Sequence, residues 1–385
     1  MDYKQLALIK HEEWHGKLEV VSRAPLATKE DLSTAYTPGV AQPCLEIASD
    51  PEKAYVYTRK GNLVAVISDG SAVLGLGNIG GIAGMPVMEG KSILFKQFGG
   101  VDAFPICLDT QDTQQIIETI VNIAPCFGGI NLEDIAAPRC FEIERALIER
   151  LDIPVFHDDQ HGTAIVVLAA IINSIRLAGK KLQDITVCIS GAGAAGSAIC
   201  RLLLSVGVKD VLLTGSKGVI HKGMQGLDAN KMELSELTNK RGVQGTLKDA
   251  IKGADVFIGV SKGGLVTGEM IESMADNAIV FAMANPVPEI FPDEAKKHGA
   301  LVVGTGRSDY PNQVNNVLAF PGIFRGALDV RAKKITQNMK ISAAYALAGL
   351  VSDSELNPDY VLPGAFDKRV APAIARAVMA CANQD

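Results

Sequence analysis

Short apolar runs recur along this chain, and each ends in an acidic or glycine-rich turn. Eight stretches of sequence fit this description: 63–68, 104–108, 154–156, 185–190, 210–214, 256–260, 279–283 and 301–303. Helical patterns lie between many of them, for example at Thr113–Ile123 and Ser197–Ser205. Strand, turn and helix in this order predict an α/β fold with parallel sheets. Such sheets bind ligands at the carboxyl ends of their strands, so we expect the functional residues in these turns.

Length and hydrophobic content favour two domains. The chain has 385 residues, 48% of them hydrophobic, which exceeds what one compact core usually holds. We expect an α/β substrate domain over residues 1–160 and a Rossmann-type dinucleotide-binding domain over 161–385. A predicted helix at about 162–178 and a polar segment at 179–184 mark this boundary. Helical spacing over about 331–385 predicts C-terminal helices, which could pack back across the first domain.

Several classes of function and location are disfavoured. The 37 basic and 43 acidic side chains leave a net charge of −6, which gives no reason to expect nucleic acid or a membrane as partner. Seven cysteines without a CxxC pair argue against a disulfide framework or a zinc site. No secretory signal is visible, and the apolar run at 164–172 is shorter than the roughly 20 residues of a membrane span. We expect a buried helix there and a cytoplasmic protein.

The segment ITVCIS-GAGAAG at 185–196 joins a strand to G-x-G-x-x-G and then to a helix. Gly191 would allow the tight turn, Gly193 the approach of a pyrophosphate, and Gly196 close packing of helix on strand. We therefore predict dinucleotide binding, although a turn selected only for packing would look the same. The residues expected to contact the cofactor here are Gly191, Ala192, Gly193, Ala194, Ala195 and Gly196.

The end of the next predicted strand bears on the choice between NAD and NADP. It reads Thr214-Gly215-Ser216-Lys217, without the acidic residue that usually holds the ribose hydroxyls of NAD. Ser216 and Lys217 could bind a 2′-phosphate, so the sequence leans toward NADP. Alternatively, Lys217 is a solvated surface charge and NAD binds without the acidic contact.

Two acidic pairs follow apolar segments in the first domain. Glu133 and Asp134 lie in GGINLEDI, and Asp158 and Asp159 lie in PVFHDDQHGTA. Adjacent carboxylates at the ends of apolar strands are costly unless something positive neutralises them. Oxygen ligands suit a hard cation, so we predict Mg²⁺ or Mn²⁺, with two separate solvated turns as the alternative. The flanking histidines are expected to cap or hydrogen-bond rather than to bind the metal.

At this point the sequence resembles a known family, the bacterial malic enzymes of the short type. The resemblance runs from about residue 20 to beyond residue 330. It rests on eight segments in this order: TAYTPGV, SDGSAVLGLGNIG, PVMEGK, GGINLEDIAAPRCFEIE, PVFHDDQHGTA, ISGAGAAG, FAMANPVPEI and NQVNNVLAFPGIFRGALD. The resemblance implies oxidative decarboxylation of L-malate to pyruvate and CO₂ with NAD or NADP and a divalent metal. It also implies a homodimer, in which one subunit could complete the other's site.

The resemblance also implies a role for each matching residue. Tyr36 matches the general acid and Lys91 the general base, with Asp158 beside Lys91; alone, Tyr36 could be a turn aromatic and Lys91 a helix-start cation. A base role requires a lowered lysine pKa, which burial near the metal would provide. The metal ligands would be Glu133, Asp134 and Asp159. The residues that would touch substrate are Asn285, which also lies near the cofactor, and Asn316, with Asn315 as its alternative.

The chain departs from its longer relatives in two ways. Ser71-Ala72 stands where longer malic enzymes carry an arginine that holds a substrate carboxylate, and the chain ends too soon for the acyltransferase-like domain of some bacterial relatives. Three alternatives stay open: a malolactic enzyme that releases lactate, a silent dinucleotide-binding protein, and an amino-acid dehydrogenase. The complete set of acids, Tyr36 and Lys91 speaks against a silent protein, and the paired acids speak against an amino-acid dehydrogenase, whose chemistry needs no metal.

Overall fold

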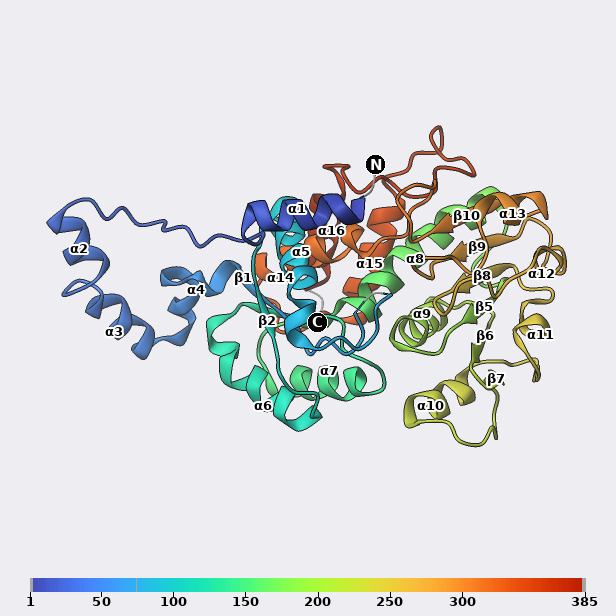
Figure 1. The fold of residues 1–385 in the computed structure, drawn as a ribbon, viewed down its shortest axis with the longest axis horizontal. Helices are drawn as coiled ribbons and strands as arrows, with labels where there is room; N and C mark the ends of the chain where they lie inside the picture. The colour runs from blue at the N-terminus through green and yellow to red at the C-terminus, as the bar shows by residue number, and fades with distance from the viewer. Residues whose placement is uncertain (1–2, 74, 383–385) are drawn as a thin grey trace.

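Two parallel sheets organise the computed structural model, which describes residues 3–73 and 75–382 (Figure 1). The first sheet has the order β2-β1-β3-β4 and is parallel throughout. Its strands are β1 Leu63–Ser68, β2 Asp102–Cys107, β3 Gly129–Leu132 and β4 Val155–His157. Its helices are α5 Gly81–Gly99, α6 Thr113–Ile123 and α7 Arg139–Arg150, with the 3₁₀ turn η3 Ala124–Cys126. Every residue of β1, β3 and β4 except Leu63 is buried, as the continuous apolar runs predict.

The second sheet has the order β10-β9-β8-β5-β6-β7. Its strands are β5 Thr186–Ser190, β6 Asp210–Gly215, β7 Gly218–Val219, β8 Val256–Gly259, β9 Ile279–Ala282 and β10 Val302–Thr305. Only β7 runs antiparallel, as a short hairpin on β6. Its helices are α9 Ala194–Ser205, α10 Ala229–Leu237, α11 Leu247–Ile251, α12 Gly268–Glu272 and α13 Pro292–Lys297. Successive strands add to opposite sides of β5, which creates the switch point where doubly wound sheets bind nucleotides.

A long helix, α8 Asp158–Ala178, leads from β4 to β5 between the two sheets (Figure 1). It begins four residues before the expected Gly162, so both acidic residues belong to its first turn. By length and composition α8 could cross a membrane, but 72% of its apolar window is buried inside the protein. The helix is therefore a core element, as its apolar sequence predicts.

The C-terminal helices pack back on the first sheet's side. They are α14 Phe320–Asp329, α15 Gln337–Ala348 and α16 Val370–Ala382, preceded by the 3₁₀ turn η4 Asn316–Leu318. The Phe95 ring of α5 lies 4.6 Å from the Phe320 ring and 5.2 Å from the Phe324 ring, between centroids. Phe324 also meets Phe156 of β4. The predicted α/β class, the order of the two sheet regions and the C-terminal helices are confirmed.

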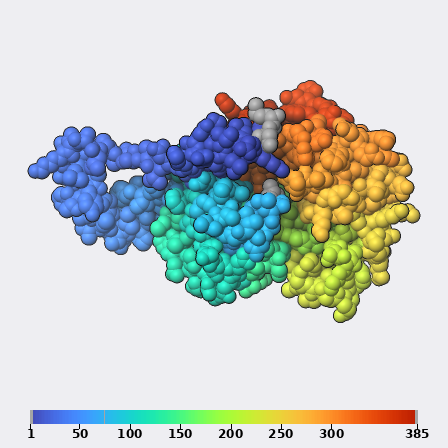
Figure 2. Space-filling model, in the orientation of Figure 1, coloured from blue at the N-terminus to red at the C-terminus, as the bar shows by residue number. Residues whose placement is uncertain are grey.

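The N-terminal residues form an arm that projects from the body (Figures 1 and 2). The first helix, α1 Tyr3–Trp14, lies along the body, and an extended segment leads to the projecting part. That part contains α2 Lys29–Ala35, α3 Ala41–Ser49, α4 Ala54–Tyr57 and the 3₁₀ turns η1 Pro51–Lys53 and η2 Arg59–Asn62. None of α1 to α4 has a buried residue among those the structure describes. Leu26, Leu45 and Val56 are each about two-thirds exposed.

Candidate active site

Three carboxylates converge where β3 and β4 end. Glu133 and Asp134 follow β3, and Asp159 lies in the first turn of α8, directly after β4. The parallel register pairs Leu132 with His157, so the two acidic turns leave the sheet at the same level. One oxygen from each of Glu133, Asp134 and Asp159 lies within 4.8 Å of the others. The structure thus brings acids from both pairs into one cluster. The alternative, in which the pairs form two separate solvated turns, does not agree with this geometry.

The electrostatics of this cluster fit a hard cation. Burial raises the pKa of Glu133 to about 7, of Asp134 to about 9 and of Asp159 to about 6, and neighbouring carboxylates add to each rise. The Asp134 Oδ2 atom is buried and has no hydrogen-bond partner among the described residues. Three oxygen donors with unbalanced negative charge are what Mg²⁺ and Mn²⁺ prefer. The donor set therefore fits the predicted metal.

The loops that carry the acids are fixed by hydrogen bonds. The Asn131 side chain donates to Glu133 at 3.0 Å, and the Asp134 backbone N–H donates to Asp159 at 2.9 Å. Ser71 and Ala72, which stand where longer malic enzymes carry an arginine, also hold this loop in place. The Ser71 hydroxyl accepts from the Ala136 N–H, and the Ala72 N–H donates to the Asp134 carbonyl. This turn therefore holds the loop after β3.

Lys91 lies in the middle of α5 and points into the acidic cluster. It is 7% exposed, and its Nζ lies 2.6 Å from Asp158 and 2.9 Å from Glu133. The Phe320 ring centroid is 4.3 Å from the same atom. Burial acts to lower the pKa of Lys91, but the two carboxylates outweigh it and hold the pKa above its ordinary value. A helix-start cation is thus the wrong interpretation, and the protein groups alone do not lower the pKa as a base role requires.

The glycine turn after β5 has the geometry predicted for it. A methyl group on Gly196 would lie 1.8 Å from the Gly191 carbonyl oxygen, and one on Gly191 would lie 2.6 Å from the Val260 oxygen. Among the described residues, apart from its two chain neighbours, no atom would lie within 4 Å of a methyl group on Gly193, so this glycine faces open space. The helix α9 begins at Ala194, just after Gly193 and three residues before the expected Ser197. Two glycines serve packing, and the third leaves room for a ligand.

A cleft of about 940 Å³ lies over this turn. Gly191, Ala192 and Gly193 line it, together with Ser216 and Lys217 from the two-residue turn of the β6–β7 hairpin. Residues 137 and 138, which follow the acidic loop after β3, also line it. The cleft has the size of a nucleotide site, and its lining reaches to within a few residues of Asp134 along the chain.

The three predicted asparagines differ in their surroundings. Asn285 is exposed in the loop after β9, against which Gly75 of the first domain packs. The Asn315 side chain accepts from the Val317 N–H and caps η4. Asn316 lies beside Asp158 at the start of α8, where burial raises the pKa of Asp158 to about 7 and Asn316 opposes the rise. Of the two alternatives, Asn316 is the one beside the acidic cluster.

Tyr36 does not join the cluster within one chain. It ends α2 on the projecting arm and is 67% exposed. Figure 1 separates this part of the arm from α5 and α8, which carry Lys91 and Asp158. Any contact between Tyr36 and such a cluster therefore needs a second chain or a movement of the arm.

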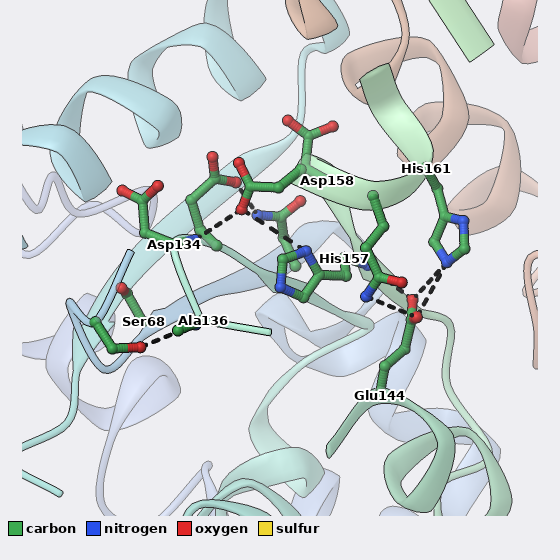
Figure 3. Close-up of polar contacts among 12 residues, drawn as sticks. Ser68, Asp134, Ala136, Glu144, His157, Asp158 and His161 are labelled. Carbon is green, nitrogen blue, oxygen red and sulfur yellow. Dashed lines mark hydrogen bonds and ion pairs between the residues drawn. The ribbon is translucent and has the colours of Figure 1, made fainter. Parts of the chain in front are cut away.

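Sequence reasoning missed two buried carboxylates near the site. Glu144 of α7 accepts hydrogen bonds from the first turn of α8 (Figure 3), and Glu289 accepts from the backbone N–H groups of Ser261 and Ala284 at 3.0 Å each. A signal for Glu144 was available, because it shares the apolar face of α7 with Cys140, Ile143 and Leu147. An acid on an apolar helical face is rarely buried without partners.

A glycine-lined cleft at the switch point of a doubly wound sheet, beside buried acids and a lysine, defines a dinucleotide-dependent enzyme. Comparisons with known proteins then narrow the class. The family model for the malic enzyme N-terminal domain matches residues 15–148, and that for the malic enzyme NAD binding domain matches residues 160–383. The chain therefore belongs to the malic enzyme family, and it is an oxidoreductase with an NAD-binding domain.

Relatives match along the whole chain. The bifunctional malic/malolactic enzyme of Bacillus subtilis is 57% identical over all of this chain and 94% of its own length. The NAD-dependent malic enzyme of Geobacillus stearothermophilus is 56% identical over 95% of this chain and 77% of its own. The crystal structure of the NAD-dependent malic enzyme of Thermotoga maritima superposes with a TM-score of 0.94 at 48% identity, over 97% of this chain and 98% of that one.

Proposed function

We propose that this enzyme converts L-malate and NAD(P)⁺ into pyruvate, CO₂ and NAD(P)H with Mg²⁺ or Mn²⁺. One observation carries the proposal: three carboxylates and a buried lysine meet at a sheet edge, and residues 137 and 138, just after the acidic loop, line the glycine-rich cleft. Glu133, Asp134 and Asp159 would hold the metal. When bound, the two cofactors would supply chemistry that the protein side chains lack: the cation would draw electron density from the C2 oxygen of malate, and the nicotinamide would accept the C2 hydride.

The side chains of the protein would accept and donate the protons of the reaction. Lys91 takes the proton of the C2 hydroxyl, and Asp158, 2.6 Å from its Nζ, orients it. Lys91 must be neutral for this step, and positive charge added beside Glu133 weakens the pairing that raises its pKa. The carboxylate on C3 then leaves as CO₂, and Tyr36 gives a proton to C3. Asn285 and Asn316 would bind the substrate.

The base assignment is tested by Lys91→Ala. We expect a folded protein whose malate oxidation falls by roughly a thousandfold or more, because general-base catalysis typically contributes about 10²–10⁴-fold. The assay follows NAD(P)H by its absorbance with Mn²⁺ present, and circular dichroism checks the fold. Malate oxidation at the wild-type rate would refute the role of Lys91.

The same assay tests the cofactor. We propose a preference for NADP, supported by Ser216 and Lys217 in the cleft and by the absence of an acidic residue at the end of β6. Relatives with either cofactor are similar to this chain, for example the NADP-dependent malic enzyme of Escherichia coli at 50% identity over 98% of the chain and 52% of its own length. A higher kcat/KM with NAD would contradict the preference.

A malolactic reaction is the second candidate, and the name of the Bacillus subtilis relative favours it. Retention of the cofactor and return of the hydride to pyruvate would give lactate without net NAD(P)H. Product analysis by chromatography separates the two, since pyruvate appears in step with NAD(P)H only in the oxidative reaction.

We also propose a homodimer working in the cytoplasm. The arm supports the dimer, because apolar side chains such as Leu45 and Val56 are exposed and lack a core of their own. In a second chain the arm could bring Tyr36 beside the partner's Lys91. The cytoplasmic location rests on the mild negative charge and on the burial of α8, the one described helix with the length and composition of a membrane span.

A further inference from the structure

A buried carboxylate lies outside the proposed metal ligands. Glu144 is 7% exposed and sits on the apolar face of α7 with Cys140, Ile143 and Leu147. A charge taken out of water is costly in general unless it is paired and hydrogen-bonded. The partners of Glu144 therefore indicate what the charge is for.

In the described part of the chain, the hydrogen-bond partners of Glu144 all lie within residues 157–161. Its carboxylate accepts from the His157 backbone N–H at 3.0 Å, from Gln160 Nε2 at 3.3 Å and from His161 Nε2 at 3.0 Å. Figure 3 shows Glu144 reaching from α7 to His161 on α8. The same stretch carries Asp158 and Asp159, so the three hydrogen bonds hold the turn that brings Asp159 to the cluster.

The contact continues to the C-terminal helices. His161 Nδ1 lies 3.1 Å from Lys340 Nζ of α15. A lysine ammonium can only donate, so Nδ1 accepts and Nε2–H donates to Glu144, as in a neutral imidazole. Glu144 thereby joins α7, which follows the Glu133–Asp134 loop, to α8, with α15 behind it.

We propose that Glu144 is a positioning residue that fixes the first turn of α8, so that Asp159 meets Glu133 and Asp134 in metal-binding geometry. The inference rests on the proposed metal site and extends it to the chain's own support for that site. Every hydrogen-bond partner of Glu144 is a donor, so only a side chain that accepts on both oxygen atoms satisfies the position. Loss of a residue that orients metal ligands commonly lowers metal affinity about 10- to 100-fold.

The test compares Glu144→Gln with Glu118→Gln in the full-length protein. In Glu144→Gln, the amide NH₂ group would face the N–H donors that the carboxylate now accepts from. Glu118 of α6 is the control, because it pairs with Arg150 at an exposed position. Mn²⁺ binding is measured by electron paramagnetic resonance of the free ion, without substrate. We expect Glu144→Gln to weaken Mn²⁺ binding roughly ten- to a hundredfold and Glu118→Gln to change it less than about twofold. NADPH binding, followed by fluorescence, should stay at the wild-type level in both.

A second variant guards against misfolding. Glu144→Asp keeps the charge and shortens the side chain by one methylene, which withdraws the carboxylate from α8; we expect roughly a fivefold or greater loss of Mn²⁺ affinity. Hydrogen–deuterium exchange of the peptide over residues 155–162 needs no metal and should speed up in both Glu144 variants. If wild type binds no Mn²⁺, the metal proposal fails, and the exchange data still decide the positioning role. Wild-type Mn²⁺ affinity in both Glu144 variants, or unchanged exchange in them, would overturn the inference.

Discussion

At the scale of single residues, the proposed metal ion would compete with protons for the oxygen atoms of the acidic cluster. Burial raises the pKa of Glu133 and Asp159 to about 7 and about 6, and that of Asp134 to about 9. A raised pKa means that each carboxyl holds a proton at pH values where an ordinary one has lost it. A metal ion requires the ionised form, so it must displace these protons.

Mn²⁺ affinity of the protein stripped with EDTA should therefore rise with pH. At about pH 6 a substantial share of these carboxyls is protonated, and at about pH 8 Glu133 and Asp159 are ionised. We expect affinity to rise on the order of tenfold or more between the two, with net proton release. Calorimetry in two buffers of different ionisation enthalpy counts the protons. Equal affinity at both pH values, without proton release, would show that the carboxyls do not bind the ion.

The sequence predicts the acidic residues of this site better than it predicts the hydrogen bonds that hold these residues in place. Adjacent acids after apolar strands are visible as a pattern, and parallel strands place such turns on one edge, so the cluster of Glu133, Asp134 and Asp159 could be anticipated. The full support could not, because His161, which donates to Glu144, also contacts Lys340, 179 positions further along the chain. Such a contact depends on how α15 packs, which the spacing of residues does not reveal.

At the scale of elements, α5 links the proposed chemistry to the C-terminal helices. Lys91 faces the acids, and one turn later Phe95 packs on Phe320 and Phe324 of α14. Periodicity predicts the last two helices, α15 and α16, and it gives the strand Leu63–Ser68 to the residue, but it does not predict α14, which begins before the expected helical region at about 331. It does not predict the short β7, because two residues carry no alternating pattern, nor the partner of α14, because an apolar face fits many surfaces.

Phe324→Ala should destabilise the contact between the C-terminal helix α14 and the first domain, which contains α5 and β4. The Phe324 ring contacts both Phe95 of α5 and Phe156 of β4, and it is fully buried. Removing a buried aromatic ring leaves a cavity and costs about 3–5 kcal/mol of unfolding free energy. Urea unfolding measures the loss. Phe366→Ala is the control: its ring is 84% exposed, so a loss below about 1 kcal/mol is expected. Similar losses for both variants would contradict the role of this contact.

At the scale of the whole molecule, the N-terminal arm has exposed apolar side chains that the body of the same chain does not cover. Its helices bury no side chain among the described residues, yet it carries exposed leucine, valine and tyrosine. Exposed apolar side chains of this kind support the proposed contact with a second chain. A symmetric dimer would use both arms, and each arm would carry Tyr36 toward the other body.

A mixture of two inactive variants tests this arrangement. Suppose that each site takes Lys91 from one chain and Tyr36 from the other. In a hybrid of Tyr36→Phe with Lys91→Ala, one site then receives both intact residues and the other site receives both altered ones. Random reassociation makes half of the dimers hybrids, and we expect about a quarter of wild-type activity after unfolding and refolding the mixture. If Tyr36 and Lys91 of one chain share a site, no hybrid has an intact one and activity stays at the level of the separate variants.

The control mixture is Lys91→Ala with Asp159→Asn. Both residues lie in the acidic cluster of a single chain, with Lys91 bonded to Asp158 beside Asp159. Each site of that hybrid keeps one defect, so its activity should not recover, whichever chain supplies Tyr36. Recovery in the first mixture alone would therefore assign the arm to the partner's site, whereas recovery in both would mean that the cluster itself is built from two chains.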